Sequence, residues 1–134
     1  MMKGADDMPY IDWEYYSSLF DNMTQEDFEK RYKQAEVKMN AVTHMRAMAY
    51  ERAYDEEAAT DFQKQIHEQI RMTMCELVNA VHIHEVSEMG TGITSVSNDG
   101  YSESYKITTA AEKEAQIISI IRNGLSGTGL AGAL

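Results

Sequence analysis

The feature that most constrains the fold is an apolar stripe whose members recur at spacings of four and three residues. The stripe consists of Phe62, Ile66, Ile70, Met74, Leu77 and Val81. Residues at these spacings lie on one face of an α-helix. The same face is widened by Met72, Cys75 and Val78. The pattern predicts a long helix from about residue 60 to residues 84–88, lying at the centre of the fold.

A second stripe predicts another long helix after residue 24. It consists of Phe28, Tyr32, Ala35, Met39 and Val42. Charged residues fill the opposite side of this helix, as expected for a face in water. The following segment, residues 46–60, contains good helix formers without a clear stripe, and its acidic run at 55–57 indicates a solvated turn.

Helix starts are marked by Thr residues followed three positions later by an acidic or amide side chain. These pairs are Thr24 with Asp27, Thr60 with Gln63, and Thr109 with Glu112. Asp12 is the predicted N-cap of a short helix that carries Trp13, Tyr16 and Leu19. The last predicted helix carries Ile117, Ile118, Ile120 and Ile121, and Gly124 is its predicted C-cap.

Residues 92–106 have the pattern of a β-hairpin arm. β-Branched residues precede Asn98-Asp99-Gly100, and Asp-Gly is favoured where a turn needs positive φ. After this turn, Tyr101 and Tyr105 alternate with polar residues. An isolated hairpin is marginally stable in water. Local physics leaves two arrangements open: the arm completes a sheet with neighbouring copies or a partner, or it folds back on its own helices.

Length and charge limit the classes of function. The chain has 134 residues, enough for one domain, and a net charge of −10. This acidity argues against nucleic-acid affinity, because phosphate contacts use Lys and Arg, and against docking on an anionic membrane. One cysteine excludes an internal disulfide. No apolar run approaches the ~20 residues of a membrane-spanning helix, and residues 1–9 form a flexible lead without a signal-peptide core, so we expect synthesis in the cytoplasm.

The chain shows no catalytic pattern. The serines do not form a G-x-S-x-G motif. His82 and His84 are two residues apart, so on a helix they point in different directions and cannot easily share a metal ion. Cys75 lies on an apolar face and is interpreted as a core residue. We therefore expect no enzyme, and no catalytic, cofactor-binding or metal-binding residues.

Two motifs resemble a known family. They are SVSNDGYSESY at residues 95–105 and GLSGTGL at residues 124–130, and they follow a short aromatic helix and two long helices. In this order and spacing the chain resembles the head–tail connector proteins of long-tailed bacteriophages, also called adaptor or head-completion proteins. The resemblance extends from about residue 10 to residue 130.

The resemblance implies a mainly α fold, a small bundle of three to four helices with a protruding β-hairpin arm before the last helix. It implies a structural virion protein, one of about twelve copies in a ring that joins the portal of the DNA-filled capsid to the tail. The ring would also meet a stopper or tail-completion protein and would let genomic DNA pass without binding it specifically. Residues 1–134 would form one connector domain, located at the neck of the virion.

The resemblance also assigns contact residues. The arm implied to contact neighbouring subunits consists of Ile93, Ser95, Val96, Asn98, Asp99, Gly100, Tyr101 and Tyr105. The extended C-terminal tail, residues 125–134, is implied to contact the portal through Leu125, Gly127, Gly129 and Leu130.

A second hypothesis comes from the acidity. A small acidic regulatory protein can mimic DNA and occupy the basic groove of a host enzyme. Such a mimic needs its carboxylates arrayed along one face. Acids and bases are mixed along the two long helices predicted here, which weighs against this alternative.

Overall fold

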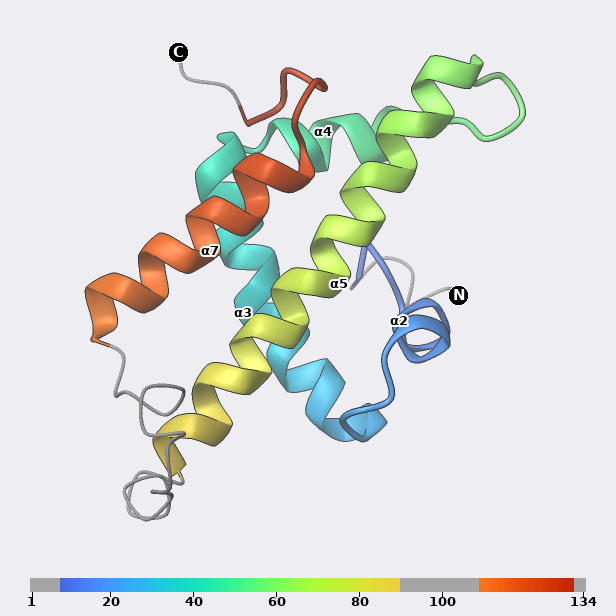
Figure 1. Ribbon diagram of the computed structural model, residues 1–134. Helices are drawn as coiled ribbons and strands as arrows, with labels where there is room; N and C mark the ends of the chain where they lie inside the picture. The colour runs from blue at the N-terminus through green and yellow to red at the C-terminus, as the bar shows by residue number, and fades with distance from the viewer. Residues whose placement is uncertain (1–7, 90–108, 132–134) are drawn as a thin grey trace.

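The computed structural model describes residues 8–89 and 109–131, and it is mainly helical (Figure 1). Within these ranges the helices are α2 (Trp13–Leu19), α3 (Gln25–Thr43), α4 (Arg46–Ala53), α5 (Asp61–Met89) and α7 (Ala110–Gly124). No strand occurs in the described ranges. The predicted mainly α fold is therefore confirmed, with one more helix than the three to four expected. The predicted hairpin at residues 92–106 lies outside the described residues.

The two longest helices cross, and α5 is central to the arrangement. Figure 1 shows α5 and α7 side by side in one layer, with α3 behind them. The contacts of α5 with α3 and with α7 are the most extensive between helices. A salt bridge of 2.8 Å from Lys38 Nζ to Glu114 Oε1 also joins α3 to α7.

Both predicted stripes form the core. Every member of the α5 stripe except Phe62 is buried. The α3 stripe is buried from Phe28 to Met39, and Val42 packs against its edge. Met72 is 40% exposed and Phe62 is 62% exposed, so the predicted burial of both side chains is wrong. The first turn of α5 projects beyond α3 and α7 in Figure 1, which leaves this ring without a packing partner.

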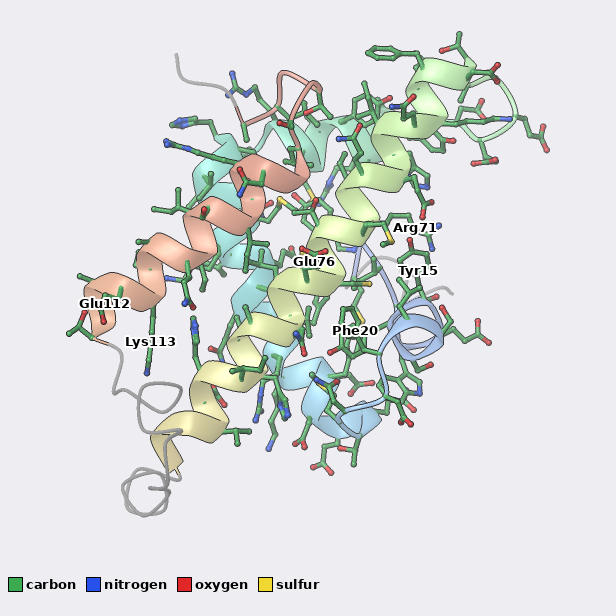
Figure 2. The ribbon with its side chains drawn as sticks, in the orientation of Figure 1. Tyr15, Phe20, Arg71, Glu76, Glu112 and Lys113 are labelled. Atoms are coloured by element: carbon green, nitrogen blue, oxygen red, sulfur yellow. The ribbon has the colours of Figure 1, made fainter. Side chains whose placement is uncertain are left out.

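The short helix α2 is attached to the bundle by aromatic packing. Phe28 of α3 is fully buried, and its ring centroid lies 5.7 Å from that of Trp13 and 5.2 Å from that of Tyr16. A second attachment reaches α5: Arg71 lies 3.8 Å above the Tyr15 ring, as Figure 2 shows. Such contacts explain how seven residues keep a helical conformation that an isolated peptide of this length would not hold.

The predicted helix starts agree with the structure. The reciprocal hydrogen bonds of a capping box are present between Thr109 and Glu112 and between Thr60 and Gln63. Thr24 accepts only the Asp27 N–H, so the predicted box there is half formed. Asp12 caps α2 by accepting the N–H of Tyr15. Local sequence thus specifies where these helices begin.

Gly124 is not the predicted left-handed C-cap. It is the last residue of α7, and the cap position is occupied by Leu125. A Cβ at Gly124 would overlap Thr73 Oγ1 and lie 2.9 Å from the Thr73 Cβ. Glycine is therefore needed here because α7 approaches α5 closely, and not because the backbone turns.

The connection between α3 and α4 has two consecutive residues in the left-handed region. His44 has φ 55° and Met45 has φ 65°, and both side chains are exposed. The Met45 N–H donates to Asn40 O at 2.8 Å, which closes the end of α3. L-residues with a side chain are disfavoured in this conformation, and glycine usually occupies it.

His44→Gly should therefore stabilise the protein by about 1 kcal/mol, because it removes the clash of Cβ with the backbone. Urea unfolding of the two proteins measures this difference. The control is Ala49→Gly at an exposed position inside α4, which should destabilise by about 1 kcal/mol. An equal decrease in the free energy of unfolding in both variants would show that the left-handed backbone at His44 carries no strain.

Candidate functional site

The predicted arm is placed only by its attachment points. Its eight assigned residues, from Ile93 to Tyr105, lie outside the described residues. In the sequence, the predicted arm lies between the end of α5 and the start of α7, and the Thr109–Glu112 capping box holds that start. Figure 1 shows these two helix ends at the same end of the bundle, and Figure 2 labels Glu112 there.

The predicted portal-contact tail is not extended over residues 125–131. These residues form consecutive turns that fold against the bundle. Leu125 is 2% exposed and belongs to the core, while Leu130 packs against it. The tail folds back because its apolar side chains gain contacts with the bundle that an extended chain would lack.

The exposed part of this C-terminal turn contains the other two assigned residues. Gly127 has φ 84° and Gly129 has φ 80°, and a Cβ at either would meet no other atom within 4 Å. These glycines are explained by backbone conformation. Between them, the Thr128 hydroxyl donates to Leu125 O at 2.7 Å and accepts the Leu130 N–H at 3.1 Å. Residues 127–129 are therefore the surface that this turn presents.

Gln69 of α5 fixes the C-terminal turn to the bundle. Its Nε2 donates to Gly124 O at 3.1 Å and to Ser126 O at 3.0 Å. The turn is thus attached by its own core leucine and by two side-chain hydrogen bonds from another helix. The C-terminal turn and the arm's attachment points lie at opposite ends of α7 (Figure 1).

A shallow hollow of about 360 Å³ lies on the outer face of α5. Its lining residues are Phe20, Glu76, Asn79, Ala80, Ile83, His84, Gln116 and Ile120. Ala80 is the smallest of these residues, and it is 9% exposed. Ile83 is 50% exposed, and Glu76 of α5, labelled in Figure 2, is also exposed. Sequence reasoning missed this surface because its residues come from three separate segments.

A buried ionisable pair joins α4 to α5 on another side of the bundle. His67 Nδ1 lies 2.9 Å from Glu51 Oε2, and the Glu51 side chain is 4% exposed. The Tyr54 ring stacks on His67 with centroids 4.0 Å apart. A hollow of about 660 Å³ beside this pair is also lined by Trp13 and Arg71. The two partners are sixteen residues apart, and nothing in the sequence indicates their contact.

Burial raises the pKa of the Glu51 carboxyl, although the hydrogen bond from His67 partly opposes this shift. A carboxyl whose pKa is higher in the folded than in the unfolded state stabilises the fold most below its unfolded pKa. That contribution is lost as the pH rises through the folded pKa.

The difference in melting temperature between Glu51→Gln and the natural protein should therefore shift in favour of the variant as the pH rises from 4 to 8. The glutamine can still hydrogen-bond to His67 but has no charge to bury. Thermal unfolding at a series of pH values measures the difference. Parallel curves for the two proteins across this range would contradict the assignment of a raised pKa to Glu51.

Cys75 is fully buried, and burial raises the pKa of its thiol to about 12. The thiolate is the reactive form, so a thiol reagent should modify Cys75 only when the fold opens. We expect the modification rate at pH 8 to rise with urea in step with unfolding. Fast modification without denaturant would contradict the buried placement. The predicted core role of Cys75 is confirmed.

In the described ranges, no group of three His, Cys, Asp or Glu side chains is placed to hold a metal ion. His84 instead forms a 2.7 Å hydrogen bond with Gln116 Oε1. None of the helices in the described part of the chain is long and apolar enough to cross a membrane. No protein-family model, curated protein or solved structure matches the chain.

Proposed function

We propose that the chain is a structural virion protein, a subunit of the ring that joins the portal of a DNA-filled bacteriophage capsid to the tail. The observation that carries the proposal is the pair of motifs at residues 95–105 and 124–130, which occur in this order within a mainly α chain. The resemblance to head–tail connector proteins rests on these motifs, since helices alone are shared by many small proteins.

The arrangement of α7 supports two separate contacts. The arm is attached at its start and the C-terminal turn at its end. In the proposal, residues 92–106 form a β-hairpin that reaches a ring neighbour, where a sheet edge supplies backbone hydrogen bonds. The opposite end of α7 faces the portal through Gly127, Thr128 and Gly129, while Leu125 anchors the turn from inside the core.

The acidity supports passage of DNA through the ring. A net charge of −10 on each subunit repels phosphate, so a duplex moves through the channel without being held. The partners proposed are about eleven further copies, the portal, and a stopper or tail-completion protein. The subunit is made in the host cytoplasm, acts in the virion neck and has no enzymatic role.

The alternative function is a small acidic binding protein that mimics DNA. The net charge of −10 favours it. Two observations weigh against it. Lys30 and Lys33 are exposed on the same helix as the acids of α3, and Glu85 and Glu114 form salt bridges with Arg31 and Lys38. These bases interrupt any continuous row of carboxylates.

A titration of the chain onto the portal protein of the same phage tests the proposal. Mass photometry should show each portal gaining about twelve subunits, and a basic DNA-binding enzyme should gain none. The matched variants are Thr128→Arg, which enlarges the exposed C-terminal turn and should weaken portal binding about tenfold, and Ala115→Arg elsewhere on α7, which should not. Binding to the enzyme and not to the portal would establish the alternative.

A further inference from the structure

We infer that the outer face of α3 in one copy packs against the outer face of α5 in the next copy. This inference deepens the proposed ring function and rests on it for the biological setting. The α3 face is defined here by Lys30, Lys33, Val37 and Ala41. The α5 face is defined by Met72, Glu76 and Ile83, with Ile120 of α7 and Phe20 at its border.

The first observation is apolar exposure at the centre of each face. Val37 is 66% exposed on the side of α3 opposite its buried stripe. Ile83 is 50% and Met72 is 40% exposed on the side of α5 turned away from α3. Covering these apolar side chains with a partner is favourable, because it removes apolar surface from water. The hollow beside Ala80 provides a concave surface that can receive a protruding side chain such as Val37.

The second observation is charge. Copies that each carry −10 repel one another, so a self-contact must use surfaces with few acids. Glu76 is the one carboxylate among the described residues that line the hollow. The α3 face carries two bases, Lys30 and Lys33, and one acid on the same side of the helix, Glu26. The two faces therefore carry opposite charges around apolar centres, which favours pairing with each other over pairing of like faces.

The third observation is placement. Figure 1 shows α5 and α7 in front of α3, so the two faces lie on opposite sides of the bundle. Two different surfaces of one chain that bind each other make a head-to-tail contact, which leads to a ring when the rotation closes. A contact of this kind would join the helical bodies of neighbours independently of residues 92–106.

Cross-linking of variants that each carry one added, exposed cysteine tests the contact without a portal. A Val37→Cys copy is mixed with an Ile83→Cys copy at high concentration and treated with a short bismaleimide. The natural Cys75 is buried and should not react. The matched control replaces Ile83→Cys with Phe62→Cys, a somewhat more exposed position on the same helix. We expect about tenfold more dimer from the Val37–Ile83 mixture than from the Val37–Phe62 mixture.

Charge reversal gives the second readout. Lys33→Glu in the Val37→Cys copy should lower the yield about tenfold, and Glu76→Lys in the Ile83→Cys copy should restore it. Equal yields with Ile83→Cys and Phe62→Cys, or absence of dimer in both mixtures, would overturn the inference. Because the isolated chain is used, this result is independent of whether the chain binds a portal at all.

Discussion

Phe28→Ala should lower the free energy of unfolding by about 3–5 kcal/mol. The Phe28 side chain is fully buried and its ring contacts those of Trp13, Tyr16 and Tyr32. Truncation removes the transfer free energy of the ring and leaves a cavity that the long helix α3 cannot collapse to fill. It also removes the surface on which α2 packs. Urea unfolding followed by circular dichroism measures the loss.

The matched control for this prediction is Phe62→Ala. The same side chain is removed at a position that is 62% exposed, so the change should stay within about 0.5 kcal/mol. A large loss at Phe62, or a small loss at Phe28, would mean that the aromatic cluster between α2 and α3 does not hold the fold together.

Gly124→Ala should lower the free energy of unfolding by about 3 kcal/mol, because the new methyl group overlaps the Thr73 side chain. To fit it, α7 must move away from α5 along their shared interface. The buried contacts of Ile117 and Ile121 would then loosen as well. Thermal unfolding of the variant beside the natural protein measures the effect.

Two companion variants identify the cause. Gly127→Ala adds a methyl group in open space at φ 84°, so it should cost only about 1 kcal/mol from backbone strain. Thr73→Ala should recover part of the stability lost in Gly124→Ala, since it removes the overlapping hydroxyl. Similar losses for Gly124→Ala and Gly127→Ala, with no recovery by Thr73→Ala, would point to backbone conformation and not to close helix approach.

The helices could be predicted because their determinants are local. Stripes at spacings of three and four identify the buried sides of α3 and α5, and Thr109 with Glu112 identifies the start of α7. The prediction fails for Phe62, where the periodicity continues past the end of the neighbouring helices. Periodicity reports that a face is apolar, but burial requires another element opposite it.

The contacts between distant segments could not be predicted. The Glu51–His67 pair and the hollow around Ala80 depend on how α4, α5 and α7 are placed, and a single sequence contains no direct record of that placement. Gly124 shows the same limit. A glycine at a helix end is usually a left-handed cap, and only the position of Thr73 on another helix reveals its different role. The apolar residues of the C-terminal tail likewise pack against the bundle, and only the folded structure shows which residues they contact.

The measurement that tests the connector function most directly is electron microscopy of the chain mixed with its cognate portal. A version lacking residues 92–106 is imaged beside it, after circular dichroism has shown that its helices are intact. The proposal predicts a ring of about twelve subunits docked on one end of the portal, and loss or weakening of that ring in the deletion variant. Portals that stay bare in the presence of the natural chain would contradict the connector function.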